Sequence, residues 1–272
     1  MLTPLTLSLG QMHLQLGEPD RNFERVHAWT HEAARRGSQL VVFPELWPTA
    51  YDLENWPKHA DALGAGWFAR LSALARETRV AIASSLLEAK DGRAYNTFAL
   101  YGADGALHGL YRKVHLVPML DEPKWLAAGD ALGTAEAAWG LTGLGICYDL
   151  RFPELWRRYA LAGARLFILP AEWPSRRAAH WQTLIRARAI ENQVFVAACN
   201  RVGDSKGEVF AGRSAVIDPW GEAVVEAGGD AEILLTAEID LAKADEIRAR
   251  IPVFKDRRPE VYGSPDSKDV EA

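Results

Sequence analysis

The chain has 272 residues, of which 49% are hydrophobic and 25% are charged, and its formal net charge is −5. This composition is that of an ordinary globular protein with a large core, and its acidic balance does not indicate a nucleic-acid surface. No apolar run approaches the ~18–20 residues of a membrane span, and no signal-peptide pattern is visible. The two cysteines, Cys147 and Cys199, form no disulfide framework. We therefore expect a cytoplasmic protein that binds neither nucleic acid nor membrane.

Short aliphatic runs alternate with helical stretches along the first half of the chain, which is typical of α/β architecture. The continuous apolar run Gln39–Phe43 predicts a strand that is covered on both faces. Ala103-Asp104-Gly105 predicts a hairpin turn. The expected strands here are Leu5–Leu9, Gln39–Phe43, Val80–Leu87, Tyr95–Tyr101 and Leu107–Tyr111, and the expected helices are Asp20–Arg36 and Trp67–Arg76.

The second half continues the same alternation and contains no repeat or low-complexity segment. The expected strands are Gly140–Ile146, Leu166–Pro170, Val194–Cys199, Ser214–Ile217, Ala223–Glu226 and Glu232–Ile239, and the expected helices are Pro153–Ala162, Arg177–Ile190 and Leu241–Arg250. Because the 22 glycines and 14 prolines form no linker-like cluster, we expect a single domain over residues 1–272 with a C-terminal tail over residues 251–272.

Three reactive side chains stand immediately after strand-like runs. Glu45 follows Leu40–Pro44, Lys113 follows Leu107–Arg112, and Cys147 follows Leu141–Ile146. In open α/β sheets, ligand sites gather beyond the carboxyl ends of the strands, so the three side chains could converge. Placement alone is a weak signal, because many strands end in a charged residue.

The residues around these three positions carry a family resemblance. Phe43-Pro44-Glu45-Leu46, Tyr111-Arg112-Lys113-Val114-His115-Leu116 and Gly145-Ile146-Cys147-Tyr148-Asp149-Leu150-Arg151-Phe152-Pro153-Glu154 resemble, in this order, the three signature blocks of the nitrilase superfamily of carbon–nitrogen hydrolases. Arg186–Gln193 and Asp218–Gly221 add further matches. The resemblance extends from Leu5 to about Tyr262 and implies a four-layer α-β-β-α sandwich.

The resemblance also implies a set of roles that suits amide hydrolysis, which needs a nucleophile, a base and an oxyanion stabiliser. Cys147 is the implied nucleophile, but a thiol with an ordinary pKa near 8.5 is mostly protonated at neutral pH. Glu45 is the implied base, and the Lys113 ammonium and the backbone N–H of Tyr148 stabilise the oxyanion. Glu122, nine residues after Lys113, is the implied fourth catalytic residue. No metal or organic cofactor is implied.

Arg151 lies four residues after Cys147, and two roles are open for it. It could form an ion pair with Glu154 or Asp149, or it could bind a substrate carboxylate, for which bidentate guanidinium pairing is well suited. Related carbamoyl-amino-acid hydrolases carry an arginine at the matching place. Three further residues follow strands that end at the same rim and are expected to wall the pocket: Tyr51, Trp173 and Glu172. Glu172 departs from many relatives, which have a small or neutral residue there.

Other candidate groups have a structural interpretation. Cys199 ends an apolar run and is expected to pack in the core. His27 and His31 are one helical turn apart, but the sequence shows no third ligand with metal spacing, so we expect a solvated surface and no metal site. His115 is also expected to be structural, because the family's mechanism uses no histidine.

Within the superfamily, Ala171–Pro174 and Cys199–Gly203 resemble bacterial omega-amidases, and Ile251–Gly263 resembles deaminated-glutathione amidases. The resemblance implies hydrolysis of a small amide that carries a carboxylate, through a cysteine thioester, with release of ammonia. N-carbamoyl amino acid or amide hydrolysis is the main alternative; an acyltransferase or a non-catalytic binding protein on the same fold stays open. Members usually form homodimers, so a homodimer is expected. The sequence does not identify the physiological amide.

Overall fold

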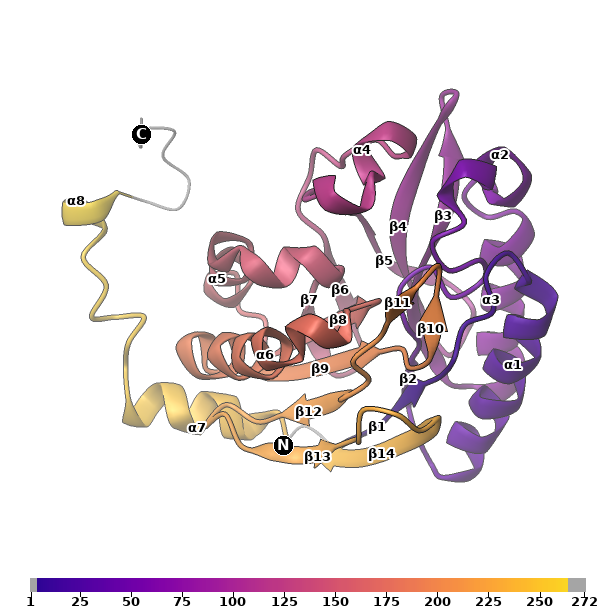
Figure 1. Ribbon diagram of the computed structural model, residues 1–272. Coiled ribbons are helices and arrows are strands. Elements are labelled where there is room, and N and C mark those ends of the chain that lie inside the picture. Colours follow the sequence, from indigo (N-terminus) through magenta and orange to yellow (C-terminus); the bar gives the residue numbers. More distant parts are fainter. Residues whose placement is uncertain (1–3, 264–272) are drawn as a thin grey trace.

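The computed structural model describes residues 4–263 and is built around a twelve-stranded mixed sheet (Figure 1). Its strand order is β13-β12-β9-β8-β7-β6-β5-β4-β3-β2-β1-β14. The strands are β1 (Leu5–Gln11), β2 (Leu40–Val42), β3 (Ala81–Lys90), β4 (Arg93–Tyr101), β5 (Leu107–Arg112), β6 (Thr134–Ala137), β7 (Gly140–Leu144), β8 (Leu166–Ala171), β9 (Phe195–Asn200), β12 (Ala215–Ile217), β13 (Ala223–Glu226) and β14 (Ile233–Ile239), with a separate small hairpin of β10 (Asp204–Ser205) and β11 (Glu208–Val209).

The two halves of this sheet lie back to back between two layers of helices. Strands far apart in the order come into contact, namely β1 with β9, β3 with β8, and β13 with β14. One outer layer holds α1 (Pro19–Arg35) and α3 (Gly66–Thr78), and the other holds α5 (Pro153–Leu161) and α6 (Ala178–Asn192) (Figure 1). This is the expected α-β-β-α sandwich. The remaining α-helices are α2 (Trp56–His59), α4 (Glu122–Trp125), α7 (Ala242–Arg250) and α8 (Pro259–Tyr262).

Strand β2 shows why the core has two layers. Leu40 and Val42 belong to the buried cluster between the two half-sheets, whereas Val41 packs with Val26 and Phe68 under the outer helices. Successive side chains of a strand point to opposite faces, so a strand with both faces covered is apolar throughout. The continuous apolar run therefore predicted this environment correctly.

The strand directions bring several strand ends to one edge. Strand β2 is parallel to β1 and β3, and β7, β8 and β9 are parallel to one another. Strand β5 is antiparallel to β4, which is antiparallel to β3, so β5 runs in the direction of β2. The carboxyl ends of β2 and β5 in one half-sheet, and of β7 and β8 in the other, carry the residues described below.

The expected elements match the observed ones to within a few residues, and the Ala103–Gly105 turn joins β4 to β5 with Gly105 at φ +79°. The sequence analysis missed several short elements, namely β6, α2, α4, α8 and the β10–β11 hairpin. Each has only two to four residues, which is too short for a hydrophobic period to be visible. Residues 264–272 of the expected tail lie outside the described residues.

Two glycines of β7 and the turn after it are required by close packing. A Cβ on Gly143 would lie 2.7 Å from the Tyr159 ring, and one on Gly145 would lie 2.4 Å from Cη2 of Trp156. Both aromatic side chains come from α5, which therefore packs directly on the backbone that leads to Cys147.

We expect Gly145→Ala to lower the free energy of unfolding by about 1–3 kcal/mol, because the added methyl group overpacks the α5 interface. Urea denaturation measures the change. Gly228→Ala is the matched control, since its Cβ would meet only Asp230 Oδ1, at 3.5 Å. Equal stability of the two variants would contradict the packing argument.

Candidate active site

The structure brings Glu45, Lys113 and Glu122 into direct contact. The Lys113 ammonium donates hydrogen bonds to Glu45 Oε1 at 2.8 Å and to Glu122 Oε1 at 2.7 Å, and all three side chains are fully buried. Glu45 follows β2, Lys113 directly follows β5, and Glu122 begins the short helix α4. The three groups are 68 and 9 residues apart in sequence and adjacent in space.

The charges in this cluster depend on one another. Burial opposes the charged form of Lys113, but the carboxylates of Glu122 and Glu45 outweigh it and raise the pKa of the lysine above its usual range. Burial also raises the pKa of Glu122, against the opposing effect of Lys113. Because the lysine keeps its proton, the cluster holds a permanent cation between two acids.

Tyr51 and Asn96 complete the network around Glu45. The Tyr51 hydroxyl lies 3.0 Å from Glu45 Oε1 and 2.6 Å from Glu122 Oε1, and the Asn96 amide donates to Glu45 Oε1 at 2.8 Å. Burial, and then the charges of the two glutamates, raise the pKa of Tyr51 well above its usual value, so it remains a donor. The sequence predicted Tyr51 as a pocket wall; the structure also gives it a polar role. Asn96 was missed, although a buried amide within an apolar strand could have pointed to it.

Cys147 occupies a strained turn immediately after β7. Its φ is +43°, in the left-handed region that is costly for a residue with a side chain. Asp149, also missed, holds this turn: it is fully buried and accepts hydrogen bonds from Ile146 N, Tyr111 Oη and His115 Nδ1 at 2.7–2.9 Å. The His115 contact agrees with the structural role expected for that residue. Cys147 is also the first residue of the 3₁₀ helix Cys147–Arg151.

The Cys147 thiol opens on a cavity of about 260 Å³. The residues that line it are Val117, Met119, Leu120, Cys147, Tyr148, Arg151, Glu172, Trp173, Pro174 and Arg177. Burial, and then the negative charge of Glu45, raise the pKa of the thiol well above its usual value, and Glu45 lies within hydrogen-bonding reach of it. A carboxylate is thus adjacent to a thiol that holds its proton. Cys199 is fully buried in the core and does not line the cavity.

Arg151 lies in this cavity and forms neither of the ion pairs considered from the sequence. Asp149 is committed to the Cys147 turn, while the Arg151 guanidinium stacks over the Trp173 ring at 4.7 Å and lies 3.4 Å from His180 Nδ1. The interpretation of Arg151 as an ion-pair partner of Glu154 or Asp149 is therefore wrong. Trp173 and Tyr148 also line the cavity.

Arg177, which the sequence analysis did not single out, is a second cation in the cavity lining. Burial, followed by the positive charges of Arg176 and Arg151, lowers its pKa. Within residues 4–263, neither Arg151 nor Arg177 lies within ion-pair distance of a carboxylate. Two guanidinium groups that repel each other in one cavity provide a site for an anion.

Glu172 also lines the cavity, and its backbone N–H donates to Glu45 Oε2 at 3.0 Å. Its carboxylate pairs with Arg201 at 2.7 Å, and both side chains are fully buried. Burial raises the pKa of Glu172 to about 7, although the positive charge of Arg201 opposes this rise. The sequence indicated that Glu172 is at the pocket but not that it has a partner.

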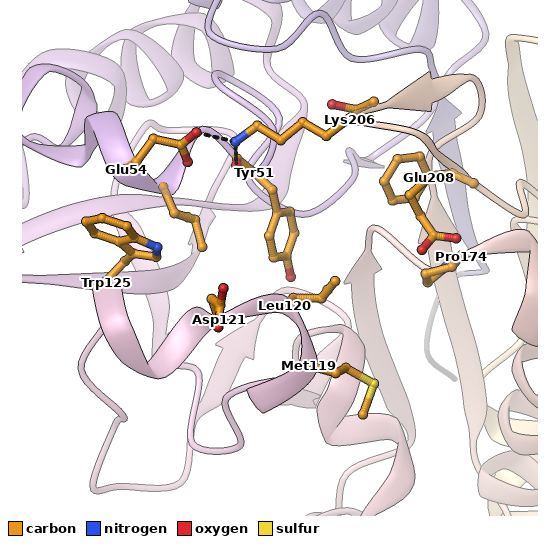
Figure 2. A pocket seen from close by; sticks show the side chains of 12 residues that line it. Tyr51, Glu54, Met119, Leu120, Asp121, Trp125, Pro174, Lys206 and Glu208 are labelled. Carbon is orange, nitrogen blue, oxygen red and sulfur yellow. Dashed lines mark hydrogen bonds and ion pairs between the residues drawn. The ribbon is translucent and has the colours of Figure 1, made fainter.

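A larger cavity of about 630 Å³ adjoins the first and shares Met119, Leu120 and Pro174 with it. Figure 2 shows the Tyr51 ring extending into it, with Lys206 linked to Glu54 at its upper edge. The Tyr51 hydroxyl thus joins this outer cavity to the Glu45 network.

The two histidines expected at the surface have a third neighbour. His27 and His31 on α1 lie near Glu77 on α3, with ligand atoms all within 4.8 Å of one another, and His31 Nε2 is 3.2 Å from Glu77 Oε1. The expectation of a solvated surface holds, since all three are exposed. The sequence showed no third ligand with metal spacing because Glu77 comes from a different helix, which packing brings beside the two histidines.

Comparison with known proteins agrees with this geometry. The sequence profile described as carbon–nitrogen hydrolase matches residues 6–249. A 2-oxoglutaramate amidase of Bacillus subtilis is 40% identical over 259 residues, which cover 94% of this chain and 99% of the relative. The human omega-amidase NIT2 is 36% identical and covers 96% of this chain and 98% of its own length.

A solved structure links the fold to cysteine chemistry. It is a mutant amidase from Nesterenkonia sp. AN1 that carries the acetamide moiety of fluoroacetamide covalently on its active-site cysteine. It superposes with a TM-score of 0.84 at 26% identity and covers 95% of each chain.

The fold and the buried polar cluster beside a thiol define a cysteine-dependent amidase. The chain belongs to the carbon–nitrogen hydrolase family, and the predicted nitrilase-like sandwich and amidase activity are confirmed. Among residues 4–263, no helix has both the length and the apolar composition that crossing a bilayer requires.

We expect iodoacetamide to alkylate Cys147 and to leave Cys199 unmodified in the native protein, because Cys147 alone of the two lines a cavity. Since the thiolate is the reactive form and the pKa of the Cys147 thiol is raised, the alkylation rate should increase as pH rises from 7 to 9. Peptide mapping after stoichiometric labelling locates the adduct, and Cys147→Ala is the control that should remain unlabelled. Labelling mainly at Cys199 would overturn the assignment.

Proposed function

We propose that this chain is an omega-amidase-like hydrolase of a small amide that also carries a carboxylate, with a 2-oxo acid amide such as 2-oxoglutaramate as the best single candidate. The observation that carries the proposal is the pair of arginines without acidic partners, Arg151 and Arg177, in the cavity of Cys147. The relatives named 2-oxoglutaramate amidase and omega-amidase support the same substrate class.

In the acylation step, Glu45 takes the thiol proton and the Cys147 sulfur attacks the amide carbon. The negative charge that develops on the carbonyl oxygen is stabilised by the Lys113 ammonium and by the backbone N–H of Tyr148. When the C–N bond breaks, Glu45 returns the proton to the leaving nitrogen and ammonia departs. The acyl group remains on Cys147 as a thioester.

In the deacylation step, Glu45 accepts a proton from a water molecule, and the resulting hydroxide attacks the thioester carbon. Collapse of the second tetrahedral intermediate breaks the C–S bond, releases the carboxylic acid and restores the thiol with the proton that Glu45 held. Glu122 and Tyr51 keep Lys113 and Glu45 in place through their short contacts during both steps.

The alternatives differ in the bond that the thiol attacks or in the fate of the thioester. N-carbamoyl amino acids also present a carboxylate, so the arginine pair is compatible with them. An acyltransferase would share the thioester and pass its acyl group to an amine instead of water. A non-catalytic binding protein is disfavoured, because Glu45, Lys113 and Cys147 are all retained and assembled.

A homodimer is also proposed. Exposed apolar side chains lie on and near α6 and α7, including Ile190, Trp220 and Ile251, and they border a cavity of about 360 Å³. These side chains could bury apolar area against a second copy. The cytoplasmic location stays a prediction.

Glu45→Gln should lower kcat for ammonia release by at least ~10²-fold, because the variant loses the base while keeping its shape. Glutamine retains an oxygen that can accept from Lys113 and Asn96, but its NH₂ group then faces the Glu172 N–H, so the melting temperature should fall while the protein stays folded. Lys113→Ala is a poorer test, because it leaves two buried carboxylates without their cation, which costs about 3–5 kcal/mol. Near-normal kcat in a folded Glu45→Gln enzyme would refute the assigned role.

Arg151→Ala and Arg177→Ala should each remove the preference for 2-oxoglutaramate over butyramide, a neutral amide of similar length. The reason is that a guanidinium contact both binds and orients the substrate, so kcat falls along with affinity. Arg176→Ala is the matched control: Arg176 is adjacent, pairs with Glu208 at 2.7 Å, and lies outside the Cys147 cavity. Measured kcat/KM ratios that are equal in the wild type and both cavity variants would reject the arginine pair as a carboxylate site. Turnover of N-carbamoyl amino acids with none of amides would favour the first alternative.

A further inference from the structure

Glu172 lines the cavity that holds Cys147, and among residues 4–263 one oxygen of its carboxylate is without a hydrogen-bond partner. Its Oε2 accepts from Arg201 Nη1 at 2.7 Å, while Oε1 has no hydrogen-bond partner and is buried. Leaving a buried polar atom without a partner costs free energy, and a charged oxygen more so. A ligand in the cavity can supply the missing donor.

The position of Glu172 indicates which part of the substrate that donor belongs to. The backbone N–H of Glu172 donates to Glu45 Oε2 at 3.0 Å, so the residue adjoins the proposed base. Because Glu45 must deliver a proton to the departing nitrogen, this nitrogen lies on the Glu45 side of the cavity. The Glu172 side chain is as deeply buried as those of Glu45 and Lys113, and Glu172 lines the cavity together with Cys147.

Arg201 fixes the orientation of the carboxylate. It is fully buried, donates to Leu14 O at 2.8 Å, and stacks over Phe210 at 4.2 Å. Since the guanidinium occupies Oε2 and cannot itself accept a hydrogen bond, Oε1 is the oxygen left for a ligand. The pair is thus a built acceptor and not a mobile side chain.

Resting on the proposed function, we infer that Glu172 Oε1 is the subsite for the NH₂ group of a scissile primary amide. The carboxylate oxygen accepts one amide N–H, holds the leaving nitrogen next to Glu45, and disfavours substrates whose leaving atom has no hydrogen to donate, such as esters. The enzyme is therefore specific for primary amides over esters of the same acyl group.

The substitution Glu172→Gln would exchange the hydrogen-bond acceptor of this subsite for a donor. Arg201 requires an oxygen, so the side-chain carbonyl of the glutamine would face Arg201 and its NH₂ group would take the place of Oε1. A donor would then meet the amide N–H, and it would suit the ester oxygen instead. The substitution retains size and burial while it exchanges acceptor for donor.

The experiment compares kcat/KM for succinamate and monomethyl succinate, which share one acyl group, at pH 8, where Glu172 is ionised. In Glu172→Gln the amide-to-ester ratio should fall about 10- to 100-fold, the usual range for a hydrogen bond to a charged group. Glu208→Gln is the control, because Glu208 lines only the outer cavity. Active sites are counted by iodoacetamide titration, so a partly unfolded variant does not distort the ratio.

Glu172→Asp provides a second test should the glutamine variant fold poorly. The shorter side chain keeps a carboxylate to pair with Arg201 but withdraws its second oxygen from the cavity, so the amide-to-ester ratio of kcat/KM should again fall. An equal loss on both substrates would mean that Glu172 only supports the structure, and an unchanged ratio would mean that it contacts no leaving group; either result overturns the inference. A wild-type enzyme that hydrolyses the ester and not the amide, or neither, would overturn the proposed function itself, and this inference with it.

Discussion

The site depends on one buried cation, the Lys113 ammonium held between Glu45 and Glu122. Taking each of these ions out of water costs several kcal/mol, and only close pairing compensates for it. Contacts of 2.7 and 2.8 Å provide that pairing. The Tyr51 hydroxyl, which remains protonated, bridges the two acids. The positions of the Lys113 cation and of Glu45, the proposed base, are consequently fixed before a substrate arrives, and this preorganisation is what electrostatic catalysis requires.

The contacts of Glu45 also show why both halves of the sandwich are needed. Glu45 follows β2 in one half-sheet, whereas the N–H that holds its second oxygen belongs to Glu172, after β8 in the other half-sheet. Cys147 follows β7, the neighbour of β8. Cys147 and Glu45, the proposed nucleophile and base, thus come from opposite half-sheets, and their separation is set by the packing of the two half-sheets and not by any local turn. Close packing of α5 on Gly143 and Gly145 contributes to the same separation from the outer side.

Sequence reasoning reached the strands and the three reactive residues because each lies in a contiguous motif with its own period or flanking residues. It did not reach Arg177, Asn96 or Arg201. Asn96 and Arg201 act through partners that are distant in sequence: Asn96 lies 51 residues from Glu45, and Arg201 lies 29 residues from Glu172.

For Arg151, the sequence instead suggested a local contact that the structure does not form. Local spacing suggested an ion pair with Asp149, but Asp149 is used by Ile146, Tyr111 and His115, a competition that only the tertiary structure reveals.

The distribution of charge in the Cys147 cavity also bears on substrate orientation. Arg151 and Arg177 supply positive charge without acidic partners, whereas Glu172 and the adjacent Glu45 supply acceptors beside the thiol. Under the proposed function, an amide with a carboxylate at its far end binds with the carboxylate on the arginines and the amide at Cys147. The reversed orientation would bring a carboxylate against Glu45 and Glu172, and like charges at short range in a poorly solvated cavity repel strongly. Orientation is then set by repulsion as well as by attraction, which is how specific sites commonly discriminate. A neutral amide would lack both effects and would bind in either direction, so the carboxylate contributes to turnover by removing unproductive binding.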